Sequence, residues 1–71
     1  MNAAPTVVHP PSPTGGRRVT VRQGGLLGIA HRDHDAVEFL RRAGLEDTET
    51  LLDDPHWVEW RDGRAHEYEA A

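Results

Sequence analysis

The chain has 71 residues and no cysteine, and this combination most narrows how it can fold. Without cysteine, neither a disulfide framework nor a zinc site with cysteine ligands can hold it together. Stability must come from one small hydrophobic core, which in a chain of this size contributes only about 3–5 kcal/mol. Self-association would add buried apolar area to such a thin core.

Residues 1–16 hold four of the five prolines and no Asp, Glu, Lys or Arg. Proline has no backbone N–H, so the run of residues 10–13 is poorly suited to a helix or a sheet ladder. The sequence predicts a disordered, proline-rich tail over residues 1–16, in which Val7 and Val8 could at most add an edge strand. It predicts one small domain over residues 17–71.

No apolar run in the chain approaches the length of a membrane span. The first residues also lack the basic start and long apolar stretch of a secretory signal. We therefore expect a cytoplasmic protein that does not contact membranes.

Residues 17–22 alternate between apolar and polar side chains, and residues 26–30 are mostly apolar. The two segments surround a glycine-containing loop and predict a β-hairpin. A three-residue loop over residues 23–25 places all the alternating apolar side chains on one face, whereas a two-residue loop scatters them. We therefore expect Val21 opposite Leu27 and Val19 opposite Ile29.

A helix is expected next, because apolar residues recur at helical spacing between Ala36 and Ala43. Asp33 or Asp35 can cap its start. Gly44 is expected just beyond its end, in the left-handed conformation. A shorter helix is expected over residues 49–53, with Pro55 ending it.

Residues 56–60 and 64–68 flank Asp62-Gly63, a strong signal for a second hairpin. A two-residue turn would place Trp57, Glu59, His66 and Tyr68 on one face, opposite Val58 and Trp60. The predicted fold is α+β, in the order β-hairpin, helix, short helix, β-hairpin, with the helices on one face of an antiparallel sheet. The predicted core is Val19, Val21, Leu27, Ile29, Val37, Phe39, Leu40, Leu45, Leu51, Leu52, Val58 and Trp60.

Charge is divided along the chain. Residues 17–32 carry four arginines and no acid, whereas residues 33–71 carry twelve acids and four arginines, for a net charge of -4 overall. The two blocks could complement each other within one chain, or meet between chains and steer association. The acidic balance argues against general nucleic-acid binding.

The densest group of potential metal ligands is His31, Asp33, His34 and Asp35. Imidazole and carboxylate together suit zinc, nickel or copper. However, the group straddles an expected strand end and helix start, where both aspartates have capping roles. We therefore expect no metal and no other cofactor.

Glu59 opposite His66 could act as an acid–base pair, but cross-strand ion pairs of this kind also stabilise sheets. The only serine, Ser12, lies in the predicted tail, and no phosphate-binding loop is present. We therefore expect a protein that is not an enzyme.

An exposed aromatic face is the stronger functional signal, because Trp, Tyr and Arg are enriched at binding hot spots. We expect a small non-catalytic protein-interaction module that binds a protein partner or itself, with a homodimer as one form. One alternative is a small nucleic-acid-contacting regulator that uses the arginine-rich first hairpin, and another is a His/Asp metal-binding protein. The expected interaction residues are Trp57, Glu59, His66, Tyr68, Arg17, Arg18 and Arg22.

Overall fold

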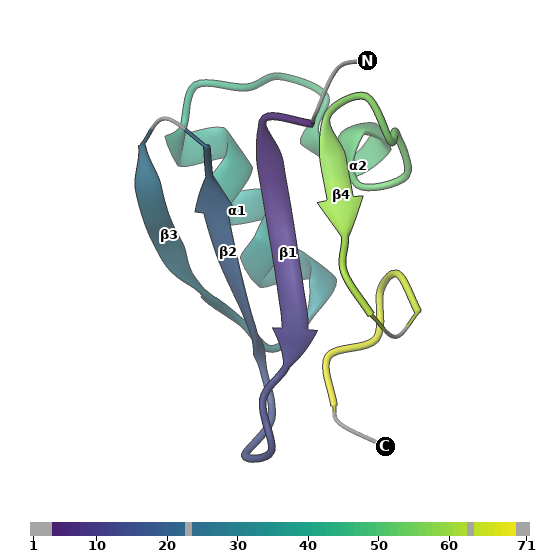
Figure 1. The fold of residues 1–71 in the computed structure, drawn as a ribbon. Helices are drawn as coiled ribbons and strands as arrows, with labels where there is room; N and C mark the ends of the chain where they lie inside the picture. Colours follow the sequence, from purple (N-terminus) through teal and green to yellow (C-terminus); the bar gives the residue numbers. More distant parts are fainter. Residues whose placement is uncertain (1–3, 23, 63, 70–71) are drawn as a thin grey trace.

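The computed structural model describes residues 4–22, 24–62 and 64–69. Within them, two helices lie on one face of a four-stranded sheet, so the predicted α+β class is confirmed (Figure 1). The elements in chain order are β1 (Thr6–Pro11), β2 (Arg17–Val21), β3 (Gly25–Ala30), α1 (Asp33–Arg42), α2 (Thr48–Leu51) and β4 (Val58–Trp60). The sheet order is β3-β2-β1-β4. The sheet is mixed rather than purely antiparallel, because β1 and β4 run parallel.

Strand β1 lies inside the segment that the sequence predicts as a disordered tail, so that prediction is wrong for residues 6–11. Val8 pairs with Val19 of β2 on one side and with Trp60 of β4 on the other. Val7 and Val8 are only 2% and 1% exposed. The prolines are tolerated because they stand at the end of the strand, where the register with β2 shifts and no regular ladder bond is required. The predicted boundary between residues 16 and 17 falls within the β1–β2 hairpin.

The first predicted hairpin is present as β2 and β3, but its register differs from the prediction. Val19 lies opposite Gly28 rather than Ile29, and a bulge leaves Leu27 as an extra residue before Thr20 pairs with Leu26. Gly28 sits against the Phe39 ring, since a Cβ atom added there would be 2.5 Å from Cζ of that ring. The close approach of this ring to the strand accounts for a glycine at the position opposite Val19.

Helix α1 ends as the sequence predicts. Gly44 has a φ of 93°, in the left-handed region. The Leu45 N–H donates to the Leu40 carbonyl at 3.1 Å, and the Gly44 N–H donates to the Arg41 carbonyl at 3.0 Å. These two bonds form a Schellman motif and satisfy carbonyls that the helix end would otherwise leave unpaired.

The start of α1 is capped differently from the prediction. The N-cap residue is Arg32, whose side chain makes no capping bond. Asp35 instead reaches back, and its carboxylate accepts the backbone N–H of His31 at 2.9 Å. Helix α2 begins one residue earlier and ends two residues earlier than the predicted range of residues 49–53.

The second predicted hairpin does not form. Strand β4 pairs with β1, and residues 64–68 form no strand. The predicted turn included Gly63, which lies outside the described residues. Residues 61–62 and 64–69, here called the C-terminal strap, turn beside the ends of β1 and β4 (Figure 1). Strand β4 forms its backbone hydrogen bonds with the side of β1 that faces away from β2. The backbone carbonyls of the strap instead accept hydrogen bonds from Arg17.

The core lies between the sheet and the helices. Its buried residues come from every element except α2, whose neighbour Leu52 contributes instead. Ile29 was predicted in the core but is 52% exposed, whereas Tyr68, predicted on the opposite face, is only 5% exposed. Neither helix in the described part of the chain is long and apolar enough to cross a membrane. The buried core cluster comprises Val8, Val19, Ala30, Ala36, Val37, Leu40, Leu52, Val58 and Tyr68.

Candidate interaction surface

The face of the sheet that the helices leave uncovered is here called the open face (Figure 1). Side chains alternate between the two faces of a strand, so the strand register assigns residues to it. The open face carries Val7 and His9 of β1, Arg18 and Thr20 of β2, Leu26 and Ile29 of β3, and Glu59 of β4.

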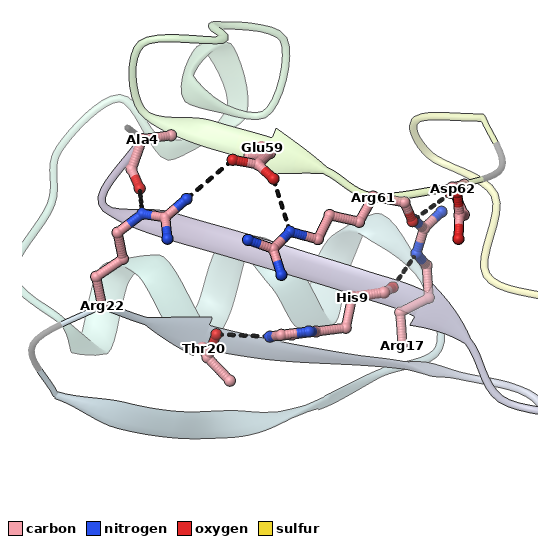
Figure 2. A network of polar contacts seen from close by, with 8 residues as sticks. All are labelled: Ala4, His9, Arg17, Thr20, Arg22, Glu59, Arg61 and Asp62. Carbon is pink, nitrogen blue, oxygen red and sulfur yellow. Dashed lines mark hydrogen bonds and ion pairs between the residues drawn. The ribbon is translucent and has the colours of Figure 1, made fainter. Parts of the chain in front are cut away.

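A polar network covers the β1 and β4 side of the open face (Figure 2). Glu59 accepts hydrogen bonds from Arg22 at 2.9 Å and from Arg61 at 2.7 Å. The hydrogen bond from Arg61 is the main reason why the pKa of Glu59 lies below its usual value. The Arg22 guanidinium also donates to the Ala4 carbonyl at 2.5 Å, which fixes that side chain against the chain entering β1. This side of the open face therefore satisfies its own charges.

His9 and Thr20 occupy the middle of the open face, where the His9 Nε2 atom and the Thr20 hydroxyl are 2.8 Å apart (Figure 2). Partial burial, followed by the nearby charges of Arg18 and Arg61, lowers the pKa of His9. A neutral His9 can either donate to or accept from the hydroxyl, so the pair is satisfied without a net charge.

The β3 side of the open face is apolar and exposed. Leu26 and Ile29 are 60% and 52% exposed, and β3 stands at the edge of the sheet. No strand pairs with its outer side among the described residues. We call this outer side of β3, together with Leu26 and Ile29, the β3 edge. It exposes both backbone hydrogen-bonding groups and apolar side chains.

The predicted aromatic face does not exist as one surface. Glu59 lies on the open face, while Trp57 lies in the turn before β4 and is 42% exposed. Tyr68 is buried in the core, and its hydroxyl donates to Asp33 at 2.7 Å. Burial, with a smaller effect of this bond, raises the pKa of Tyr68. His66 lies near Tyr68 on the helix side of Trp60, and so not beside Glu59.

The three arginines of the predicted basic strand have different roles. Arg18 is exposed on the open face, and Arg22 pairs with Glu59. Arg17 is fully buried, and its guanidinium lies 5.2 Å from the centre of the Trp60 ring. Desolvation by burial lowers the pKa of Arg17.

All five N–H groups of the Arg17 guanidinium donate to backbone carbonyls, part of which Figure 2 shows. Five donors are the full complement of an arginine side chain. Four of the five acceptors belong to the C-terminal strap. Arg17 therefore organises the strap and is not available to an external partner. The acceptors are the carbonyls of His9 at 2.7 Å, Arg61 at 2.6 Å, Asp62 at 2.7 Å, Arg64 at 3.1 Å and Glu67 at 2.9 Å.

The candidate metal ligands do not converge. Asp35 binds a backbone N–H, His31 and His34 are exposed, and Asp33 binds Tyr68 and His66. Among the residues that the structure describes, no group of three or more histidine and carboxylate side chains could hold a metal ion.

Sequence reasoning missed the β3 edge, because it assigned Ile29 to the core and gave Leu26 no role. No local signal revealed it, because Leu26 and Ile29 are three residues apart, and two residues with that spacing share a face of a strand only where a bulge intervenes. It also missed Arg61 and His9, since β1 was not expected to be part of the sheet.

The comparisons with known proteins identify no relative: no family model, no curated protein and no solved structure matches the chain.

Proposed function

We propose that this chain is a small non-catalytic protein-interaction module that pairs with a second copy of itself through the β3 edge. The observation that carries the proposal is an edge strand without an outer partner, bearing the two most exposed large apolar side chains of the described residues, Leu26 and Ile29. Edge strands of this kind readily accept another strand, and burial of the apolar side chains adds to the backbone bonds.

Because of the bulge, a second copy of β3 matches the side-chain pattern of the β3 edge better than a regular strand would. Leu26 and Ile29 point to the open face, whereas Leu27 packs against the core and Gly28 lies against Phe39. A regular strand alternates at every residue and cannot match this pattern. A second β3, related by a two-fold axis between residues 27 and 28, places its Ile29 beside Leu26 of the first copy. It also places its Gly28 beside Leu27.

Charge does not oppose this pairing. Arg18 lies next to Ile29 on β2. In the two-fold arrangement, the two copies of Arg18 are separated by three strand spacings, about 14 Å across the sheet. That separation exceeds the Debye length of about 8 Å at physiological ionic strength. Contact between the four apolar side chains therefore comes with little charge repulsion.

The test is sedimentation of the wild type and of a Leu26→Arg, Ile29→Arg variant at two concentrations. We expect the weight-average mass of the wild type to rise toward that of a dimer, and the variant to stay monomeric while keeping its circular dichroism spectrum. Trp57→Arg is the matched control, because Trp57 is also a large exposed apolar residue but lies beside the opposite edge of the sheet.

A wild type that stays monomeric at every concentration would contradict the proposal. Loss of association in the Trp57 variant alone would instead place the interface where the sequence first located it. The nucleic-acid alternative has less support, since Arg22 and Arg61 on the open face are already paired with Glu59.

A further inference from the structure

The C-terminal strap lies over the edge of the core and is fastened at several points. The Gly16 N–H donates to the Tyr68 carbonyl at 2.8 Å. The Tyr68 ring packs edge-on against Trp60, with 5.9 Å between the ring centres. The imidazole of His66 lies on the same indole at 5.3 Å. The strap therefore covers one side of Trp60.

His66 is held between two carboxylates from different parts of the helical layer. Its Nδ1 atom is 2.7 Å from Oδ2 of Asp33, in the first turn of α1. Its Nε2 atom is 2.5 Å from Oδ1 of Asp53, just after α2. An ionised carboxylate only accepts hydrogen bonds, so both ring nitrogens must donate. With both carboxylates ionised, only a doubly protonated, positively charged imidazole makes the two hydrogen bonds together.

The backbone at His66 indicates that these contacts hold the strap in place. His66 has a φ of 70°, in the left-handed region that residues other than glycine seldom adopt. Such a conformation persists where surrounding contacts compensate for it. Among the described residues, the His66 side chain contacts the two carboxylates and the Trp60 ring.

We propose that His66 is a proton-dependent latch that fastens the C-terminal strap to helix α1 and to the turn after α2, and that loss of its proton loosens the strap and uncovers Trp60. A neutral imidazole keeps one N–H and can donate to only one of the two carboxylates. Its second nitrogen then presents a lone pair to the other carboxylate, which is repulsive. The latch goes beyond the proposed self-association, because it lies on the side of the sheet away from the open face.

The charged groups around His66 favour its protonated form. The hydrogen bond to Asp53 is the largest cause of its raised pKa, partial burial opposes it, and Asp33 adds to the increase. Tyr68 donates to the same Asp33. Asp35 and Arg17 also lie near Tyr68 and affect its pKa in opposite directions. The side chain of Arg17 is fixed by carbonyls, so it does not replace His66 at the carboxylates.

The direction of the pH effect follows from this raised pKa. The contribution of the latch to strap closure is fully present below the unfolded histidine pKa of about 6.5. It is lost as the pH rises through the higher pKa of the folded state. For each pKa unit by which strap closure raises the pKa of His66, deprotonation of His66 increases the equilibrium constant for strap opening by about tenfold.

The test uses a Trp57→Phe background, in which Trp60 is the only tryptophan, and titrates it from pH 5 to pH 9. We expect the Trp60 emission to shift to longer wavelength with a midpoint above 6.5, matching the titration of the His66 imidazole followed by NMR. His66→Gln should abolish the transition, and Asp53→Asn should lower its midpoint. His34→Gln, which removes an exposed histidine from α1, should leave it unchanged.

Two results would overturn the latch. One is an unchanged Trp60 transition in the His66→Gln variant, and the other is titration of His66 without any change at Trp60. Neither readout depends on self-association, so a failure of the latch and a failure of the β3 pairing are distinguishable. The titration is run at a concentration at which sedimentation shows one species.

Discussion

Substitution of Arg17 by Ala is expected to unfold most of the protein at 25 °C. The fully buried guanidinium saturates five backbone carbonyls, four of them in the C-terminal strap. Removing the guanidinium leaves these carbonyls without their donor, and each unsatisfied buried acceptor typically costs about 1–3 kcal/mol. The loss of several such bonds together matches or exceeds the roughly 3–5 kcal/mol that a core in a domain of this size supplies. Urea unfolding followed by circular dichroism measures the loss directly.

Two further variants separate the geometry of Arg17 from its charge. Arg17→Lys keeps the charge but offers three donors from one point, so it cannot reach all the carbonyls that lie around the edge of the planar guanidinium. We expect the free energy of unfolding of this variant to be about 2 kcal/mol lower than that of the wild type, because each unsatisfied buried acceptor costs about 1–3 kcal/mol. Arg18→Ala, at an exposed neighbour, should stay within about 0.5 kcal/mol of the wild type. An Arg17→Ala variant as stable as Arg18→Ala would contradict this account.

Val8→Asp should abolish folding. Val8 is 1% exposed and pairs with both neighbouring strands in the centre of the sheet. An unpaired carboxylate there cannot ionise without a large desolvation cost. We expect the free energy of unfolding to fall by more than about 4 kcal/mol, which is comparable to all that the core supplies. The amide NMR spectrum of the variant should show the narrow dispersion of an unfolded chain.

Thr14→Asp is the matched control, because Thr14 belongs to the same proline-rich segment but lies exposed in the turn between β1 and β2. Its spectrum should remain that of the folded protein. If residues 1–16 were a tail, as the sequence predicts, the two variants would behave alike. Equal stability of the two would therefore refute the central position of β1.

Local signals predicted the parts of the fold that depend on neighbouring residues. The apolar stripe and Gly44 predicted α1 and its end, since a helix satisfies its bonds within itself and its last turn needs a left-handed residue. The glycine-containing loop likewise predicted that β2 and β3 pair. The register failed, because it depends on the Phe39 ring lying against Gly28, a contact made across the core.

Strand β1 and the strap escaped prediction for a different reason. The segment that forms β1 is short and ends in prolines, so only its pairing with both β2 and β4 makes it a strand. The Asp-Gly signal at residues 62–63 was outweighed by bonds from Arg17, which is more than forty residues earlier in the chain. No local pattern reports such distant partners.

The sequence by itself determined the α+β class, the helix α1 with its end, and the need to stabilise a thin core without disulfides. The tertiary structure decided which apolar side chains are buried and which are presented. It moved Tyr68 into the core and Ile29 to the open face. It also buried the Arg17 guanidinium, which donates hydrogen bonds to backbone carbonyls of the strap. The physical reason is that helix periodicity and end caps act over a few residues, whereas strand register and burial of a charge depend on partners that only the folded chain brings together.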